Sequence, residues 1–170
     1  IHKMMLPGDF IAMKLTGEIL TSETGLSEGI FWDFKKNGIS EQVLKNYQIA
    51  ESWIPKVVPS YSLQGKVNAK AAQLTGIEEG VPVSYRAGDQ PNNAFSLQVL
   101  KPGELATTAG TSGTVYGVCD TPLYDPKSRV NTFVHVNHTE KKPSFGVLLC
   151  VNGTGILNSW VKKAMGASKI

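Results

Sequence analysis

Apolar side chains recur at three- and four-residue spacing in several parts of the chain, and this spacing predicts short helices. In the first of these helices, Pro7 suits the opening turn and Gly17 is placed to end it. Asn68 and Gly76 stand where they can cap another helix at its two ends. The predicted helices cover residues 6–16, 40–47, 70–74, 91–100 and about 154–165.

Shorter apolar runs between turn residues predict strands. The predicted strands cover residues 81–85, which we expect to be buried, and 105–109, 114–118, 130–136 and 145–151. A Ser/Thr/Gly-rich connector is expected at 21–29, and an extended or turning connector at 53–59, where two prolines interrupt the apolar residues. The chain changes from helix-rich to β-rich at Lys101–Gly103, so we place a domain boundary there, between residues 1–100 and 101–170.

Composition indicates a globular α/β chain, since hydrophobic residues make up 41% of the 170 residues and can form a core. The net charge is +3, and basic residues cluster only as Lys141–Lys142 and Lys162–Lys163, so we predict no nucleic-acid surface. Cys119 and Cys150 lack the partners of a zinc site or a disulfide framework, and we expect free thiols. No apolar run reaches the roughly 18 residues of a membrane span. With no visible leader, we expect no membrane association and a cytoplasmic location.

The segment Ala-Gly-Asp-Gln at 87–90 is the first candidate for chemistry. A strand that leads into glycine and aspartate places a carboxylate at the carboxyl end of that strand, where α/β sheets bind ligands. Asp89 could accept a proton from a substrate hydroxyl, and the amide of Gln90 could bind a polyol. The alternative is that Asp89 caps the helix beginning at Pro91.

Two glycine-containing turns are candidates for binding an anion or a nucleotide. The turn Gly110-Thr111-Ser112-Gly113 offers backbone amides and hydroxyls to a phosphate, although an ordinary hairpin would use the same glycines. The segment Asn152-Gly153-Thr154-Gly155 lies between a strand and a helix, where its glycines could admit a nucleotide or simply make the turn. His135 and His138 are expected on opposite faces of a strand, so we predict no metal site.

Several motifs follow one another in a fixed order. They are Leu-Pro-Gly-Asp-Phe at 6–10, Lys-Leu-Thr-Gly-Glu at 14–18, Ala-Gly-Asp-Gln at 87–90, Ala-Gly-Thr-Ser-Gly-Thr-Val at 109–115 and Asn-Thr-Phe-Val-His at 131–135. This series resembles the FGGY family of carbohydrate kinases, from about residue 4 to residue 166. Within the family, the Gly-Thr-Ser-Gly turn and the Thr-Phe-x-His stretch are most similar to the xylulokinase subfamily.

The resemblance implies an actin-like ATPase (ribonuclease-H-like) fold, with parts of two domains in this chain and with sugar and ATP bound between the domains. It implies that Asp89 is the catalytic base and that Gln90 contacts the sugar. The ATP contacts implied are Gly110, Thr111, Ser112 and Gly153. Mg²⁺ is expected to bridge the phosphates of ATP, and the sequence suggests no metal ligand of its own.

D-Xylulose is the sugar that the resemblance favours, with ribulose, gluconate or glycerol as alternatives. A non-catalytic sugar- or nucleotide-binding module is a further alternative. Arg86 replaces a small residue of the family pattern and would either contact phosphate or pack. The sequence resembles the middle third of a longer kinase, so we expect this chain alone to be inactive. Unpartnered sheet edges and apolar faces would favour self-association, and a homodimer is the form to test for.

Overall fold

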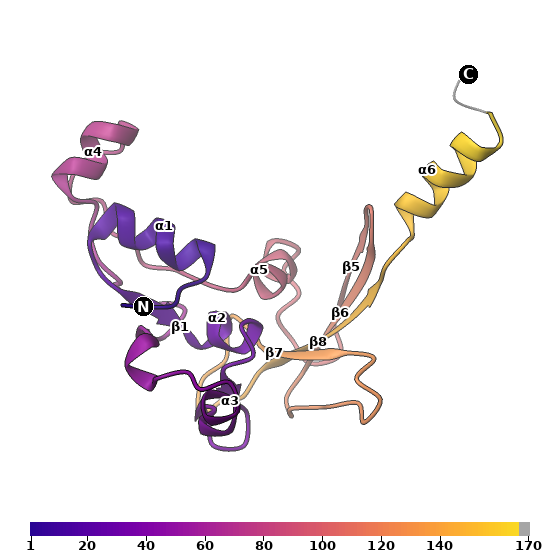
Figure 1. Ribbon diagram of the computed structural model, residues 1–170, viewed down its shortest axis with the longest axis horizontal. Helices are drawn as coiled ribbons and strands as arrows, with labels where there is room; N and C mark the ends of the chain where they lie inside the picture. Colours follow the sequence, from indigo (N-terminus) through magenta and orange to yellow (C-terminus); the bar gives the residue numbers. More distant parts are fainter. Residues whose placement is uncertain (167–170) are drawn as a thin grey trace. The chain divides into compact units, whose positions relative to one another are not determined.

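The structure is a computed structural model that describes residues 1–166 (Figure 1). It divides into two compact units, Ile1–Asp89 and Gln90–Ile170. This division lies within a helix, upstream of the composition change at Lys101–Gly103. That residues 1–100 and 101–170 belong to two kinase domains stays a prediction.

The first unit is mainly helical, with two small sheets. Strand β1 pairs in parallel with β4, Thr21 opposite Val57, and β2 pairs with β3 in an antiparallel hairpin. The elements are α1 (Pro7–Thr16), β1 (Leu20–Ser22), α2 (Glu23–Glu28), β2 (Trp32–Asp33), β3 (Gly38–Ile39), α3 (Glu41–Asn46), the 3₁₀-helix η1 (Glu51–Trp53), β4 (Lys56–Val58) and α4 (Ala69–Thr75).

Local capping explains why the helix predictions in this unit are confirmed. Gly17 ends α1 with a left-handed φ of 87°. The Ser40 hydroxyl accepts the N–H of Val43 at the start of α3. Asn68 accepts the N–H of Ala71 at the start of α4, and Gly76 ends that helix with φ 75°. Each cap is a contact between residues close in sequence, so it can be read from the sequence.

The connector predicted at 21–29 is wrong, whereas the extended or turning connector at 53–59 is confirmed in part. Residues 21–29 form the end of β1 and all of α2, and residues 53–59 include β4. Ser22 and Thr24 are fully buried here. Their hydroxyls have hydrogen-bond partners, because Ser22 accepts the N–H of Gly25 and lies 2.8 Å from the hydroxyl of Thr24. Satisfied hydroxyls can be buried at little cost, so a Ser/Thr-rich segment can lie inside the fold.

The prediction of a buried strand at 81–85 is also wrong. The segment is extended and pairs with residues 61–67 through backbone hydrogen bonds, such as the one from the N–H of Val83 to the carbonyl of Gly65, but it forms two isolated bridges and no named strand. Val81 is 39% exposed. Pro82 has no N–H to donate, which prevents a regular ladder at the centre of the segment.

The second unit is built on a four-stranded sheet with the order β5-β6-β8-β7, all neighbours antiparallel. The strand predictions are confirmed with small changes at the ends. The elements are α5 (Asp89–Ser96), β5 (Leu105–Ala109), β6 (Gly113–Cys119), β7 (Asn131–Val134), β8 (Phe145–Val151) and α6 (Gly155–Ala164). Helix α5 ends earlier than predicted because Gln98 adopts φ 58° and the N–H of Val99 turns back to the carbonyl of Ala94.

One face of the sheet forms the core of the second unit. Ala94 of α5 and the following Val99 pack there, with residues from all four strands. The buried cluster consists of Ala94, Val99, Ala106, Tyr116, Val118, Phe133 and Leu148. Helix α6 has the predicted extent, but its apolar side chains Ile156, Leu157 and Trp160 are exposed.

Candidate active site

Contacts within the first unit fix the backbone at the start of α5. The N–H of Asp89 donates to Oε2 of Glu28 at 2.8 Å, and the N–H of Gly88 donates to Oγ1 of Thr24 at 3.3 Å. Thr24 and Glu28 both belong to α2. Asp89 itself is exposed. The chain therefore presents a carboxylate to solvent on a backbone that α2 holds in place.

A side chain at Gly88 would displace the carboxylate of Glu28 from its present position. A Cβ at this position would lie 1.9 Å from Oε2 of Glu28 and 3.3 Å from the carbonyl of Thr24. Any side chain would push Glu28 away and remove the acceptor of the Asp89 amide. The close approach explains why glycine precedes Asp89.

Arg86 packs inside the first unit and makes no contact suited to a phosphate. Its Nη1 lies 3.1 Å from Oδ1 of Asp9 and also donates to the carbonyl of Leu20. Both charged side chains are almost fully buried, at 6% and 5% exposed. The ion pair ties the segment before Asp89 to α1 and β1.

The glycine turn at 110–113 is confirmed as the tip of the β5–β6 hairpin and lies against the start of α6. The N–H of Gly155 donates to the carbonyl of Gly110 at 3.0 Å, and the N–H of Ile156 donates to that of Thr111 at 3.3 Å. The hydroxyl of Thr154 donates to the carbonyl of Gly110 as well, at 3.2 Å. The first amides of α6 thus bind the turn.

This contact fixes the direction of the turn's own amides. In a trans peptide unit the C=O and the N–H point in opposite directions. Because the carbonyls of Gly110 and Thr111 point toward α6, the amides of Thr111 and Ser112 point away from it. Two successive amides on one side of a turn, beside two hydroxyls, are suited to binding an anion.

Gly153 lies at the junction of β8 and α6, with φ 108°, a conformation that favours glycine. Gly155 follows two residues later, and a Cβ added there would lie 2.3 Å from the carbonyl oxygen of Gly110. The β8–α6 junction and the 110–113 turn therefore meet. The structure brings Gly110, Thr111, Ser112 and this junction together in the second unit.

The predicted site residues therefore form two groups. Asp89 ends the first unit and Gln90 follows it, whereas the turn and Gly153 belong to the second unit. Sequence reasoning did not assign a supporting role to Thr24, Glu28 or Asp9, whereas Thr154 and Gly155 belong to the segment that it had named. Asp9 lies in the Leu-Pro-Gly-Asp-Phe motif at 6–10, but nothing in the sequence links it to Arg86.

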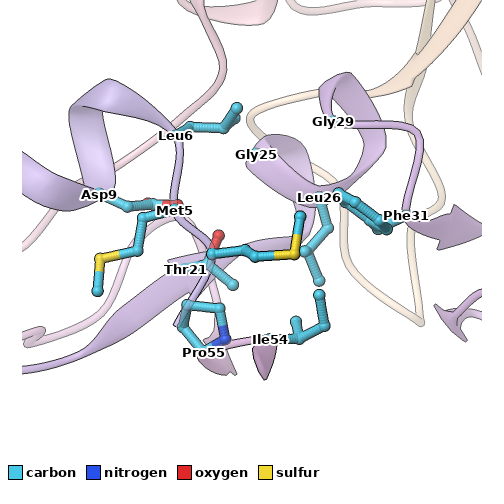
Figure 2. Close-up of a pocket in the computed structure, with 11 residues that line it drawn as sticks. Met5, Leu6, Asp9, Thr21, Gly25, Leu26, Gly29, Phe31, Ile54 and Pro55 are labelled. Carbon is cyan, nitrogen blue, oxygen red and sulfur yellow. The ribbon is translucent and has the colours of Figure 1, made fainter. Parts of the chain in front are cut away.

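The first unit also contains a small pocket of about 130 Å³ that is separate from Asp89 (Figure 2). Figure 2 shows the side chains of Met5, Leu26 and Ile54 around it, with Thr21 and Asp9 supplying the polar groups. None of the predicted site residues lines this pocket. Its mostly apolar lining does not resemble a sugar site.

His135 is a buried structural residue. It is fully buried, and its ring nitrogens lie 3.0 Å from Oη of Tyr116 and 3.0 Å from the carbonyl of Val99. Burial lowers the pKa of His135. Within residues 1–166, no three His, Cys, Asp or Glu side chains gather as a metal site would require. Cys119 and Cys150 are free thiols, as predicted.

None of the helices in the part of the chain that the structure describes is long and apolar enough to cross a membrane.

Comparisons with known proteins give the chain its relatives. A xylulose kinase from Staphylococcus xylosus is 25% identical over 169 residues, which cover 99% of this chain and 34% of the relative. A gluconokinase from Bacillus subtilis is 28% identical over 153 residues, covering 89% of this chain and 28% of the relative. The chain thus spans about a third of the length of the curated relatives it matches.

The fold has a close match among solved structures. The xylulose kinase from Rhodospirillum rubrum aligns with a TM-score of 0.81 and 27% identity, covering 95% of this chain and 32% of that one. The chain therefore has the α/β, actin-like ATPase (ribonuclease-H-like) fold expected from its motifs. A family profile described as "FGGY family of carbohydrate kinases, N-terminal domain" matches residues 1–96. The chain belongs to the FGGY family of carbohydrate kinases.

Proposed function

We propose that the protein carrying this chain is an ATP-dependent sugar kinase that converts D-xylulose to D-xylulose 5-phosphate. The observation that carries the proposal is the exposed carboxylate of Asp89 on a backbone fixed by Glu28 and Gly88. The xylulose kinases of S. xylosus and R. rubrum support the choice of sugar. The reaction belongs in the cytoplasm, where ATP is supplied.

Asp89 is the general base in this proposal. Its carboxylate accepts the proton of the sugar hydroxyl as that oxygen forms a bond to the γ-phosphorus of ATP. The bond between the γ-phosphorus and the bridging oxygen breaks, and ADP leaves with the electron pair. A positioned base contributes about 10²- to 10⁴-fold to such a rate. Gln90, the next residue, contacts the sugar through its amide.

The 110–113 turn binds the phosphates of ATP. The amides of Thr111 and Ser112 point away from α6, and Thr111 is exposed. Donors placed beforehand around a phosphoryl group lower the energy of its transition state, because the protein supplies mainly position and charge. Gly110 and Gly153 keep side chains away from the nucleotide.

Mg²⁺ fits this arrangement as an ion held mainly by ATP. Magnesium sites of this kind use one or two carboxylates together with substrate phosphates. The turn would hold the phosphates through its amides and hydroxyls, and Asp89 keeps the role of base. When bound, Mg²⁺ would neutralise charge on the phosphates.

Two alternatives remain. The gluconokinase of B. subtilis is as similar to this chain as the xylulose kinases are, so ribulose, gluconate or glycerol could replace D-xylulose. The second alternative is a module that binds sugar or nucleotide without catalysis. Binding alone requires no base, so the fixed and exposed Asp89 favours an enzyme.

Replacing Asp89 tests the proposal in the natural protein that carries this sequence. We expect Asp89→Asn to lower kcat by about 10²-fold or more, while sugar affinity stays nearly unchanged. ADP formation with D-xylulose, measured by a coupled assay, gives both values. Glu79→Gln is the matched control, since Glu79 is an exposed carboxylate outside both groups of site residues. Near-normal turnover by Asp89→Asn would return Asp89 to a helix-capping role.

We further propose that the 170-residue chain by itself does not phosphorylate sugars. It spans about a third of its curated relatives, and their remaining length would supply the rest of the substrate and nucleotide contacts.

A further inference from the structure

Glu28 stands at a position that its own helix does not favour. It is the last residue of α2, and the last turn of that helix contains no basic residue. The C-terminal end of a helix carries a partial negative charge, so a carboxylate there is unfavourable for the helix. The same carboxylate accepts the N–H of Asp89 at 2.8 Å, across 61 residues of sequence. The distant contact therefore explains the position of Glu28 better than α2 does.

The amide that Glu28 accepts is the first amide of α5. The first four N–H groups of a helix have no partner within it, and a neighbouring side chain commonly accepts one of them. Asp89 is the first residue of α5, and its carboxylate makes no hydrogen bond to any other residue within 1–166. Two carboxylates therefore divide two tasks: that of Glu28 binds the helix amide, and that of Asp89 is left exposed.

Gly88 makes room for this contact. A Cβ at Gly88 would lie 1.9 Å from Oε2 and 2.8 Å from Cδ of Glu28. The carboxylate of Glu28 thus occupies the space that a side chain at residue 88 would take. The residue before Asp89 and the acceptor of the Asp89 amide are matched in shape.

Helix α2 is itself anchored inside the first unit. Thr24 is fully buried, and its Oγ1 lies 2.8 Å from Oγ of Ser22 and 3.4 Å from Oγ of Ser60. Ser22 ends β1, and Ser60 follows β4. Thr24 also accepts the N–H of Gly88 at 3.3 Å. The helix that carries Glu28 is therefore tied to the paired strands β1 and β4, and it offers a fixed support.

We propose that Glu28 is a positioning residue for the reaction. It caps the first amide of α5 from another helix, holds the backbone of Asp89 on the first unit, and leaves the Asp89 carboxylate to act as base. A base must lie within hydrogen-bond reach of the hydroxyl whose proton it takes, so freedom of its backbone lowers the rate. This inference rests on the proposed function and concerns contacts within the first unit alone.

Four variants of the natural protein test the role of Glu28. Glu28→Ala removes the acceptor, and Glu28→Gln keeps an amide oxygen that can accept the same N–H. Gly88→Ala displaces the carboxylate of Glu28, and the double variant Glu28→Ala/Gly88→Ala has no carboxylate to displace. Glu41→Ala is the matched control, because Glu41 belongs to another six-residue helix and its exposed side chain pairs only weakly with Lys36, at 3.5 Å.

The first expectation concerns Glu28 alone. Glu28→Ala should speed hydrogen exchange at the amides of residues 88–91 about tenfold. It should lower kcat about tenfold and leave KM for the sugar within about twofold, since no ligand contact is removed. Glu28→Gln should recover most of both losses. The thermal midpoint should stay within about 2 °C of the wild type, because a carboxylate at the end of α2 adds little to that helix. Glu41→Ala should change neither kcat nor exchange at residues 88–91.

The second expectation concerns the pairing of Glu28 with Gly88. Gly88→Ala alone should lower kcat about tenfold, because its Cβ takes the place of the Glu28 carboxylate. The double variant should have a kcat within about twofold of that of Glu28→Ala, since the two substitutions remove the same contact. Losses that multiply to about 100-fold would show independent effects and overturn the proposed pairing.

The remaining outcomes separate the positioning role from the proposed function. Unchanged exchange at residues 88–91 in Glu28→Ala would overturn the contact, whatever the activity. Faster exchange with unchanged kcat would overturn the positioning role and leave the kinase proposal in place. A loss of kcat in Glu28→Gln as large as in Glu28→Ala would assign the effect to charge and overturn the capping role. A wild-type protein that phosphorylates no sugar would end the proposed function and the positioning role together, with the exchange data still deciding the contact.

Discussion

Arg86, three residues before Asp89, forms a buried ion pair with Asp9. Removing charges from water is costly, and the cost is offset only while both partners are present. Leu20 supplies a further acceptor, so the guanidinium has more than one partner. The segment that presents Asp89 therefore depends on a contact to a residue near the start of the chain.

We predict that Arg86→Met lowers the free energy of unfolding by about 3–5 kcal/mol, because it leaves the buried Asp9 carboxylate unpaired. Urea unfolding of the natural protein measures this change. Lys36→Met is the control: the Lys36–Glu41 pair is exposed, with N–O 3.5 Å, and its loss should change stability by less than about 1 kcal/mol. Equal effects of the two substitutions would contradict the assigned role of Arg86.

His135 predicts a pH dependence of stability. Burial lowers its pKa below the ordinary value of 6.5, so the unfolded chain binds this proton more readily than the folded chain. The contribution is complete above pH 6.5 and is lost as the pH falls from 6.5 through the lowered pKa. Unfolding free energies measured from pH 7.5 to about 5 should fall less steeply in His135→Gln than in the wild type. Identical slopes in the two proteins would contradict a lowered pKa of His135 in the folded state.

At the level of residues, the sequence indicated Asp89, Thr111 and Ser112 as candidates, because short motifs carry them. It did not reveal Glu28 or Thr24, which hold the Asp89 segment from a distant part of the chain. The folded chain brings such partners together from distant positions, and no local sequence pattern around a polar residue identifies its distant partner.

At the level of elements, the packing of α6 on the 110–113 turn is the main feature of the proposed phosphate-binding group. The first amides of the helix donate to the carbonyls of the turn. Because of these hydrogen bonds, the amides of Thr111 and Ser112 point away from the helix. Helix α6 is therefore part of the proposed site through its backbone.

We predict that Gly155→Ala raises KM for ATP about tenfold, because the added Cβ would lie 2.3 Å from the carbonyl of Gly110 and separate α6 from the turn. KM for the sugar should stay the same. Gly8→Ala is the matched control, since a Cβ at this glycine of α1 meets nothing within 4 Å. Steady-state kinetics with each substrate varied in turn gives both constants, and an unchanged KM for ATP in Gly155→Ala would contradict the role of the turn.

Elements with local signals were predicted well. Helices α1, α3 and α4 carry their own caps, and the β5–β6 hairpin carries its own turn. Strand β1 was missed because its partner, β4, lies far along the chain. Helix α2 was missed because its buried hydroxyls resemble those of a loop.

At the scale of the whole molecule, the second unit leaves apolar surface uncovered. On the sheet, Val115 and Leu149 face each other across β6 and β8, and both are exposed, at 37% and 40%. Helix α6 adds Leu157 and Trp160, which are 56% and 65% exposed. Neighbouring apolar side chains of this kind favour association with another apolar surface.

We predict that the 170-residue chain alone self-associates with rising concentration, with a homodimer as the first form. Sedimentation velocity should show this association for the wild type and a clear reduction for the variant that combines Leu149→Lys and Trp160→Lys. Tyr124→Lys is the control, because Tyr124 is 83% exposed and lies in a loop. A wild-type chain that stays monomeric at high concentration would contradict the prediction.

The proposed function rests on sugar-dependent phosphoryl transfer by the natural protein. The most direct measurement is ADP formation from Mg²⁺–ATP with D-xylulose, D-ribulose, D-gluconate and glycerol in parallel, with the phosphorylated product identified by mass. We expect the fastest reaction with D-xylulose, and we expect one molecule of D-xylulose 5-phosphate to form for each ADP. Absence of a phosphorylated product with all four substrates would contradict it.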